Sequence, residues 1–349
     1  NTIFKIVICL CIACLLPAQN INNPKIGLVL SGGGAKGFAH IGTLQLMDSL
    51  GIKPDYIAGT SMGGIIGALY SIGYSGKEIE ELARRTDWTE LFTDTPPRDL
   101  LPHFIKKNTG KYQVEFGLKG FTPVVPSGII QGQKINQLFT KLVFDYENIT
   151  NLDSLPIPFS CIAVDVPSGK EIVITKGPLS KAMRATMSIP SVFSPVEWDD
   201  YLLIDGGVLN NYPADIAKKV GMDFIIGVNV SAPKKSKEQL RSFLDLLDQT
   251  INIPGYPKEE VHAKMSDILV VPEIGSFSAQ DFNDDDVKEI IRIGKEAAYK
   301  NLDQFLALRD RLKRDTSITH TRSVKNDEIE RQSHKKLLHG IVITGNETL

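Results

Sequence analysis

The chain has 349 residues, of which 42% are hydrophobic and 23% charged, and its formal net charge is −2. This composition is ordinary for a globular protein and excludes broad disorder, and the length allows one or two domains with a large buried core. The nearly neutral charge gives no electrostatic reason to expect nucleic acid as a partner.

The first residues have the character of a targeting segment. Residues 3–16 are nearly all apolar but too few to span a membrane comfortably, and a polar stretch follows Ala18. We interpret residues 1–18 as a signal peptide and expect an exported protein, in the periplasm, at the outer membrane or secreted. Cys11–Cys14 also loosely fits a lipoprotein site. Three of the four cysteines lie in this segment, so a mature chain with Cys161 alone would hold no internal disulfide.

A glycine-rich loop follows the first apolar run. Residues 26–30 predict a strand, Gly32, Gly33 and Gly34 come just after it, and a helix is expected over 38–50. Three consecutive glycines leave backbone N–H groups uncovered at a helix N-terminus, where anions bind. An acyl-transfer enzyme needs such donors for the oxyanion of its tetrahedral intermediate.

Two phosphate-binding motifs compete for this loop. The spacing of Gly32, Gly34 and Gly37 fits a dinucleotide-binding fingerprint, but that motif needs an acidic residue at the end of the next strand. The next predicted strand ends in Gly59-Thr60-Ser61 instead. A P-loop is disfavoured because Gly-Lys-Ser/Thr is missing. The oxyanion interpretation fits the downstream sequence better.

The pattern Gly-x-Ser-x-Gly comes next, formed by Gly59, Ser61 and Gly63. An apolar strand over 55–58 precedes it, and an apolar helix over 65–70 follows it. This context predicts a nucleophile elbow, a sharp turn that lifts the serine hydroxyl clear of the sheet at the helix N-terminus. Glycine is needed on both sides because a Cβ would collide with the neighbouring backbone. The alternative is an ordinary strand-to-helix turn with an incidental serine.

The middle and later parts of the chain resemble an α/β scaffold. Residues 89–130 are rich in Pro, Gly and Phe, and they form either a cap over the site or a surface excursion. The other expected elements are a hairpin of 162–165 with 171–175, a helix over 179–187, strands at 224–230 and 268–272, and one long helix over 285–311.

Asp205 is the third candidate for chemistry. Residues 201–204 predict a strand, so Asp205 would stand at its C-terminal end, followed by Gly206 and Gly207. Ligand chemistry gathers at that edge of open α/β sheets. The alternative is a turn aspartate in an ordinary Asp-Gly hairpin.

The glycine loop, the elbow and the Asp-Gly-Gly turn together resemble the patatin-like phospholipase family, in the family's order. The segment Arg184–Pro190, with Phe193 after it, also resembles the family's segment before its aspartate, and the similarity covers residues 26–231. The resemblance implies a three-layer α/β/α fold with a mainly parallel central sheet. It also implies a Ser–Asp dyad that cleaves acyl esters of lipids, without a cofactor or metal.

By position in the motifs, Ser61 matches the family's nucleophile and Asp205 its base. Gly32, Gly33 and Gly34 match the oxyanion loop. Many members have alanine at the position of Gly207, and we expect the extra glycine to loosen the turn but leave the carboxylate in place.

A conventional Ser–Asp–His triad is the competing mechanism. Aspartate is a weak base unless desolvation raises its pKa, which a lipid-filled site favours. A triad in hydrolase order needs a histidine after Asp205. Of the four available, only His262 lies in the expected globular region, in a stretch that we interpret as a solvated helix, and we expect a packing role for His40. The other three are His320, His334 and His339.

After the signal peptide of residues 1–18, we divide the chain into three further parts. Residues 26–312 form the predicted patatin-like hydrolase domain, and 313–339 a charged linker. Residues 340–349 resemble the opening strand of a POTRA module, which some bacterial relatives carry before an outer-membrane barrel. An edge strand of the hydrolase domain is the alternative.

The sequence predicts a secreted, serine-dependent lipid acyl hydrolase of phospholipase A or esterase type. Its expected partners are a phospholipid or other acyl ester and a membrane surface, and the oligomeric state is not predicted. The alternatives are a triad esterase that uses His262 and a non-catalytic lipid-binding domain of an outer-membrane protein.

Overall fold

The computed structural model describes residues 23–93, 117–119, 122–124, 128–231 and 253–316, with 237, 246 and 249–250 between them. The chain divides into the compact unit Pro24–Arg309 and a second unit made of its two ends. The predicted signal peptide and POTRA-like strand, and most of 89–130, lie outside the described residues, so these stay predictions. The same holds for the charged linker predicted over 313–339 except at its start, because the described residues 313–316 continue the helix Leu302–Thr316.

Within the described residues, the centre of Pro24–Arg309 is an eight-stranded sheet. Neighbouring strands are parallel from β12 to β6 and antiparallel from β6 through β10 to β9 and between β6 and β7. The predicted mainly parallel sheet is confirmed. Its order is β12 (Ile268–Val270), β11 (Phe224–Val228), β1 (Ile26–Leu30), β2 (Tyr56–Thr60), β6 (Phe159–Asp165), β10 (Tyr201–Asp205) and β9 (Val196–Trp198), with β7 (Lys170–Ile174) beside β6.

The central strands are covered on both faces. Every residue of β1, β2 and β6 is buried. Parallel strands of this kind read as continuous apolar runs because helices cover both sides of the sheet. That is why the sequence shows unbroken apolar segments here and not alternation.

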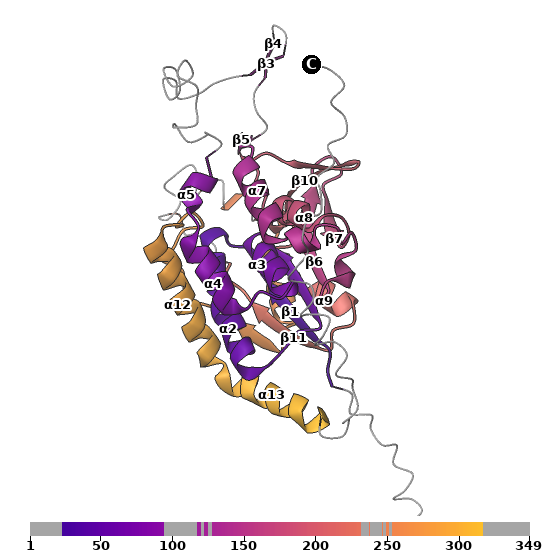
Figure 1. The fold of residues 1–349 in the computed structure, drawn as a ribbon, viewed down its shortest axis with the longest axis vertical. Helices are drawn as coiled ribbons and strands as arrows, with labels where there is room; N and C mark the ends of the chain where they lie inside the picture. The colour runs from indigo at the N-terminus through magenta and orange to yellow at the C-terminus, as the bar shows by residue number, and fades with distance from the viewer. Residues whose placement is uncertain are drawn as a thin grey trace, which may run out of the picture. The chain divides into compact units, whose positions relative to one another are not determined.

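Helices form one outer layer around α3 (Met62–Ser71). The backbone of Gly67 lies so near the sheet that a Cβ there would be 2.9 Å from Ile57 and 3.4 Å from Phe159. Figure 1 shows α2 (His40–Leu50), α4 (Gly76–Arg85) and α12 (Asp284–Lys300) side by side on this flank, and α8 (Leu179–Thr186) next to α3.

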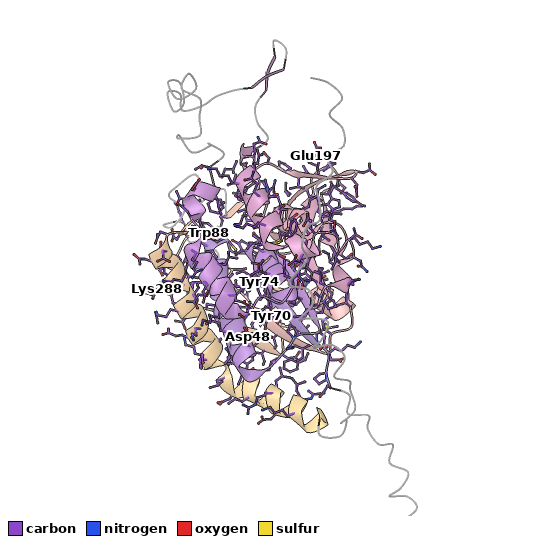
Figure 2. All side chains as sticks on the ribbon, in the orientation of Figure 1. Asp48, Tyr70, Tyr74, Trp88, Glu197 and Lys288 are labelled. Carbon is purple, nitrogen blue, oxygen red and sulfur yellow. The ribbon has the colours of Figure 1, made fainter. Side chains whose placement is uncertain are left out.

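Asp48 fastens three of these helices to one another. The Tyr70 hydroxyl of α3 donates a hydrogen bond to Asp48 Oδ1 at 2.7 Å, and the N–H of Gly76, the first residue of α4, donates to Oδ2 at 2.7 Å. Figure 2 labels Asp48 and Tyr70 on their helices. One side chain of α2 therefore links α3 and α4 to its own helix.

The opposite face of the sheet carries α9 (Ala214–Lys219) and α11 (Tyr256–Ala263). A buried apolar cluster joins Val29, Ala58 and Ile162 of the sheet to Ile216 and Ala217 of α9. The predicted three-layer α/β/α arrangement is therefore present.

The long helix predicted over 285–311 is broken. It is α12 followed by α13 (Leu302–Thr316), with Asn301 between them. The Asn301 side chain donates to the carbonyl of Ala297 at 3.0 Å. Such back-bonding competes with the helical ladder, and periodicity alone does not reveal it.

The hairpin of β6 and β7 is confirmed. None of the helices in the described part of the chain is both long and apolar enough to cross a membrane. The shorter elements are η1 (Gly34–Ala39), α5 (Trp88–Leu91), β3 (Gly117–Lys119), β4 (Thr122–Val124), β5 (Gly128–Ile130), α7 (Gln133–Leu142), η3 (Phe144–Tyr146), η4 (Leu152–Ser154), β8 (Ser191–Phe193) and η5 (Gly206–Val208).

Candidate active site

The sheet brings the ends of β2 and β10 together. β2 pairs with β6 as far as Thr60, which lies opposite Ile162 of β6. The next residue of β6, Ala163, lies opposite Asp205, the last residue of β10. Because β7 occupies the other edge of β6 over 161–165, β2 and β10 must share one edge. They run toward each other, so Ser61 and Asp205 meet although 144 residues separate them.

Ser61 occupies a strained elbow between β2 and α3. Its backbone has φ 54° and ψ −125°, a conformation that a non-glycine residue adopts at a cost of about 1–3 kcal/mol. A Cβ on Gly59 would lie 2.5 Å from the Gly63 carbonyl oxygen, and one on Gly63 would lie 2.4 Å from that of Leu30. Both glycines are therefore required by backbone collisions, as predicted for a nucleophile elbow.

The Ser61 hydroxyl donates a 2.6 Å hydrogen bond to Asp205 Oδ2. The other carboxylate oxygen accepts the N–H of Gly207 at 2.7 Å, and the backbone N–H of Asp205 donates to the Ser188 carbonyl. Asp205 is 5% exposed. Burial raises its pKa to about 6, against the opposing effect of the hydrogen bonds from Ser61 and Gly207.

The glycine loop lies directly against Ser61. A Cβ on Gly32 would be 3.0 Å from Ser61 Cβ. The N–H of Gly32 donates to the Asn211 carbonyl at 3.1 Å, whereas those of Gly33 and Gly34 have no hydrogen-bond acceptor among the described residues. Of the three glycines predicted as oxyanion donors, Gly33 and Gly34 thus have N–H groups available to a ligand, whereas the Gly32 N–H is already used.

The remaining motif glycines are packing positions. A Cβ on Gly37 would lie 2.3 Å from Met62 Cγ, and one on Gly206 would lie 2.4 Å from the Ile162 carbonyl oxygen. Gly207 has more room, because its Cβ would meet the end of the Asn211 side chain at 2.9 Å. These contacts hold the loop, the elbow and the aspartate turn within van der Waals distance of one another.

A model of patatin-like phospholipases matches residues 28–218, more than half of the chain and the part that holds Ser61 and Asp205. The chain belongs to the patatin-like phospholipase family. The family is described as one of phospholipases, the enzyme class that the sequence predicts.

The family relatives are longer than the matched segment. An uncharacterized NTE family protein of Mycobacterium tuberculosis (strain ATCC 25618 / H37Rv) is 31% identical over 216 residues, 62% of this chain and 52% of that protein. Patatin-like phospholipase domain-containing protein 6 of Mus musculus is 29% identical over 219 residues, 62% of this chain and 14% of that protein. The chain spans about half the length of the mycobacterial relative.

Two solved structures are similar at lower identity. VipD from Legionella pneumophila has a TM-score of 0.46 at 14% identity, and the match covers 81% of this chain and 67% of that chain. Human GIVD cytosolic phospholipase A2 has a TM-score of 0.44 at 10% identity, with coverage of 83% and 60%.

The patatin-like chain contains two site residues that sequence reasoning missed. Thr186 Oγ1 accepts the Ser61 N–H at 2.9 Å and donates to the Ile162 carbonyl at 2.6 Å, so it fixes the elbow. Met62 follows the nucleophile in the first turn of α3, where N–H groups lack intrahelical acceptors. The sequence could have indicated Met62, because the backbone N–H of the residue after the elbow serine binds the oxyanion in other elbow enzymes.

Neither His40 nor His262 contacts Ser61 or Asp205. The helix around His262 was expected to be solvated, but the His262 side chain is only 5% exposed. Its Nδ1 lies 2.9 Å from the Tyr212 carbonyl oxygen and 3.3 Å from Asp215 Oδ1. His40 is buried, as expected for packing, with Nε2 2.8 Å from the Ser31 carbonyl oxygen, and burial lowers its pKa to about 4.

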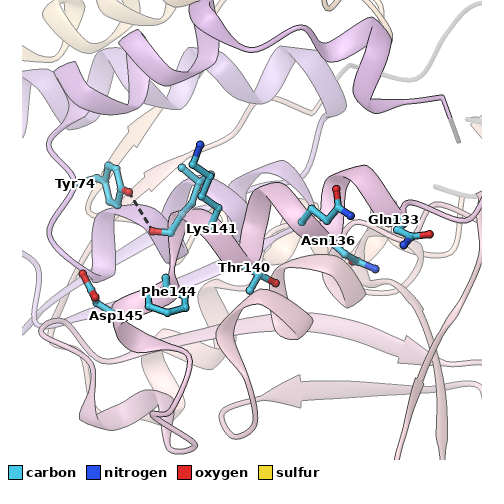
Figure 3. A pocket seen from close by; sticks show the side chains of 9 residues that line it. Tyr74, Gln133, Asn136, Thr140, Lys141, Phe144 and Asp145 are labelled. Carbon is cyan, nitrogen blue, oxygen red and sulfur yellow. Dashed lines mark hydrogen bonds between the residues drawn. The ribbon is translucent and has the colours of Figure 1, made fainter. Parts of the chain in front are cut away.

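A shallow pocket lies elsewhere, along the outer face of α7. Figure 3 shows this pocket, which Tyr74 and Phe144 help to line. The Tyr74 hydroxyl donates a hydrogen bond to the Leu142 carbonyl at 3.1 Å, and the Phe144 side chain is 64% exposed. Ser61 and Asp205 do not line this pocket. It therefore has no part in the candidate active site.

Proposed function

We propose that this protein is a serine-dependent lipid acyl hydrolase of phospholipase A or esterase type that uses a Ser61–Asp205 dyad. The observation that carries the proposal is the 2.6 Å hydrogen bond from an elbow serine to a deeply buried carboxylate. A serine hydroxyl is a poor nucleophile without an adjacent base, and this contact supplies one. Family membership supports the same reaction class.

In the acylation step, Ser61 Oγ attacks the ester carbonyl carbon while its proton passes to Asp205 Oδ2. The negative charge moves to the carbonyl oxygen, which accepts the N–H groups of Gly33 and Gly34. The intermediate then collapses, and the proton on Asp205 leaves with the alcohol product. Water attacks the acyl-serine by the same route, and the released Ser61 regains its proton.

Aspartate is suited to this task by its surroundings. A pKa of about 6 makes Asp205 a stronger base than an exposed aspartate, yet leaves it ionised at neutral pH. The same low-dielectric environment strengthens the interaction between the oxyanion and its N–H donors. Burial thus serves both halves of the proposed mechanism.

The surroundings of the glycine loop support an apolar substrate. Phe38 of η1 packs against Trp88 and Phe282, with ring centroids 5.3 and 6.0 Å away. Phe92 and Phe193 extend this aromatic cluster. We propose a phospholipid or another acyl ester, met at a membrane surface by an exported protein, as the natural setting.

The decisive test is Ser61→Ala with a chromogenic acyl ester. We expect turnover to fall to background and a serine-reactive phosphonate to label Ser61 in the parent protein alone, as mass spectrometry of the labelled peptide would show. Parent-like turnover by a folded Ser61→Ala protein would refute the nucleophile assignment.

The oxyanion loop is tested separately by Gly33→Pro, which removes one N–H donor and also distorts the loop, because proline cannot adopt the φ of 171° at this position. Loss of a single oxyanion donor costs about a hundredfold or more in kcat. A folded variant with parent kcat would mean that the loop has another role.

The two alternatives make different predictions for the same proteins. A triad esterase loses activity when His262 is removed, and a non-catalytic lipid-binding domain binds vesicles without turnover or phosphonate labelling. No contact of the described residues favours either of them.

A further inference from the structure

Asn211 connects the glycine loop to the turn that carries the dyad aspartate. Its backbone carbonyl accepts the Gly32 N–H at 3.1 Å. Its side-chain Nδ2 donates to Ser231 Oγ at 2.6 Å and makes a longer contact of 3.4 Å with the Gly32 carbonyl oxygen. Both polar groups of Gly32 therefore contact Asn211, six positions after Asp205, and the Gly32 carbonyl also accepts the Ser31 hydroxyl at 3.2 Å.

The same side chain fills the space between the two motifs. A Cβ on Gly32 would lie 2.3 Å from Asn211 Oδ1, and a Cβ on Gly207 would lie 2.9 Å from it. These distances are shorter than a normal van der Waals contact, so a Cβ at either position would press on Asn211 Oδ1. Asn211 is wedged between the loop and the turn.

We propose that Asn211 is a positioning residue that holds Gly33 and Gly34 at the correct distance from the Ser61–Asp205 dyad. This proposal rests on the proposed function. Asn211 does not touch the reacting atoms. It acts through Gly32, the residue that joins Ser31 at the end of β1 to the two uncovered N–H groups.

The effect of such a residue falls on the transition state. Charge on the substrate oxygen develops only after Ser61 attacks, so misplaced N–H donors weaken binding of the tetrahedral species and leave ester binding almost unchanged. A displacement of about 1 Å is enough to cost a hundredfold in rate. Removing a side chain that only stabilised the fold would lower the melting temperature, but it would not weaken binding of the tetrahedral species more than binding of the ester.

The first test is Asn211→Ala, with folding checked by circular dichroism and thermal unfolding. We expect kcat to fall about ten- to hundredfold with little change in KM, and the affinity for a trifluoromethyl ketone analogue of the ester to fall in parallel with kcat/KM. Ser231→Ala, which removes the best hydrogen bond of Asn211, should reproduce the loss more weakly. Asn210→Ala serves as the matched control, because that amide faces Glu171 and Asp215 instead.

The second test uses Gly207→Ala, whose methyl group would lie 2.9 Å from Asn211 Oδ1 and 3.1 Å from Asp205 Oδ1, while the N–H that Asp205 accepts is kept. If the methyl group acts by displacing Asn211, its effect on kcat should largely disappear in the Asn211→Ala background. The double-mutant cycle would then show a coupling energy distinct from zero.

The outcomes are separable from those of the proposed function. Folded Asn211→Ala with parent kcat, or with reduced kcat but unchanged ketone affinity, overturns the positioning role while phosphonate labelling of Ser61 still supports the dyad. A parent protein that neither hydrolyses the ester nor reacts with the phosphonate overturns both proposals.

Discussion

Asp165 and Asp205 are buried carboxylates on neighbouring strands, and their pKa values are shifted in opposite directions. Both accept a serine hydroxyl and a backbone N–H, and their exposed fractions are 4% and 5%. Hydrogen bonds from Ser168 and Leu202 lower the pKa of Asp165, whereas burial raises the pKa of Asp205 to about 6.

The depth of the two groups explains the difference. Asp165 precedes the turn of the β6–β7 hairpin, where residues 166–170 are all exposed, so only its nearest neighbours cover it. Asp205 precedes the buried Gly206 and Gly207, so more protein surrounds its charge. Surface coverage alone does not predict a pKa, because desolvation depends on how much protein surrounds the charge. The comparison assigns a structural role to Asp165 and the proposed base to Asp205.

The largest effect is expected for Asp205→Asn, which keeps the shape of the side chain but removes the proton acceptor. We expect kcat to fall at least about a hundredfold, the scale of general-base losses. Steady-state kinetics with a soluble acyl ester would measure it. Parent-like turnover by the folded variant would leave the two aspartates functionally equivalent and remove the dyad.

Asp205→Asn should raise the stability of the folded state even though it lowers kcat. A pKa raised from 3.8 to about 6 means that the folded state binds this proton more tightly, so stability falls as pH rises through that window. Asp205→Asn removes the buried charge, and we expect the free energy of unfolding at pH 8 to rise by about 1–3 kcal/mol. Urea unfolding of parent and variant at pH 4 and pH 8 would test this, and equal pH dependence of the two would contradict it.

The pH profile gives the next largest effect. Because Asp205 must be ionised to accept the serine proton, kcat/KM should be level well above pH 6 and fall about tenfold per pH unit below it. The measurement needs a substrate without a titratable group. An acid limb near pH 4 would mean that Asp205 resembles an exposed carboxylate, contrary to the comparison with Asp165.

Asp165→Asn should lower thermal stability and leave turnover in the parent range. Its lowered pKa means that the carboxylate stabilises the fold above the pKa of the unfolded chain, and that this stabilisation is lost as pH falls through the folded pKa. The difference in melting temperature between parent and variant should therefore shrink in acid. Loss of kcat without loss of stability would reverse the assigned roles.

The smallest effect on kcat is expected for His262→Ala. The variant loses the contacts with Tyr212 and Asp215, so we expect a loss of about 1–3 kcal/mol of stability and turnover close to that of the parent. Near-complete inactivation of a well-folded His262→Ala protein would favour a triad and make the comparison of the two aspartates irrelevant to catalysis.

The sequence by itself determined the local parts of this protein. The apolar runs of the buried strands and the Gly-x-Ser-x-Gly turn were readable because strand burial and turn sterics depend on neighbouring residues. The same local signal identified Gly59 and Gly63 as obligatory glycines. The break at Asn301 was missed because a side-chain bond to Ala297 leaves no periodic signal.

Only the tertiary structure decided which of these parts meet. β6 aligns the ends of β2 and β10, and this shared edge brings Ser61 to Asp205. The Gly32 N–H is taken by Asn211 across 179 residues of chain, a choice that no pattern around the glycine loop encodes. The burial of His262 and the depth of Asp205 likewise depend on distant segments, because desolvation is a property of the packed molecule and not of the sequence around a residue.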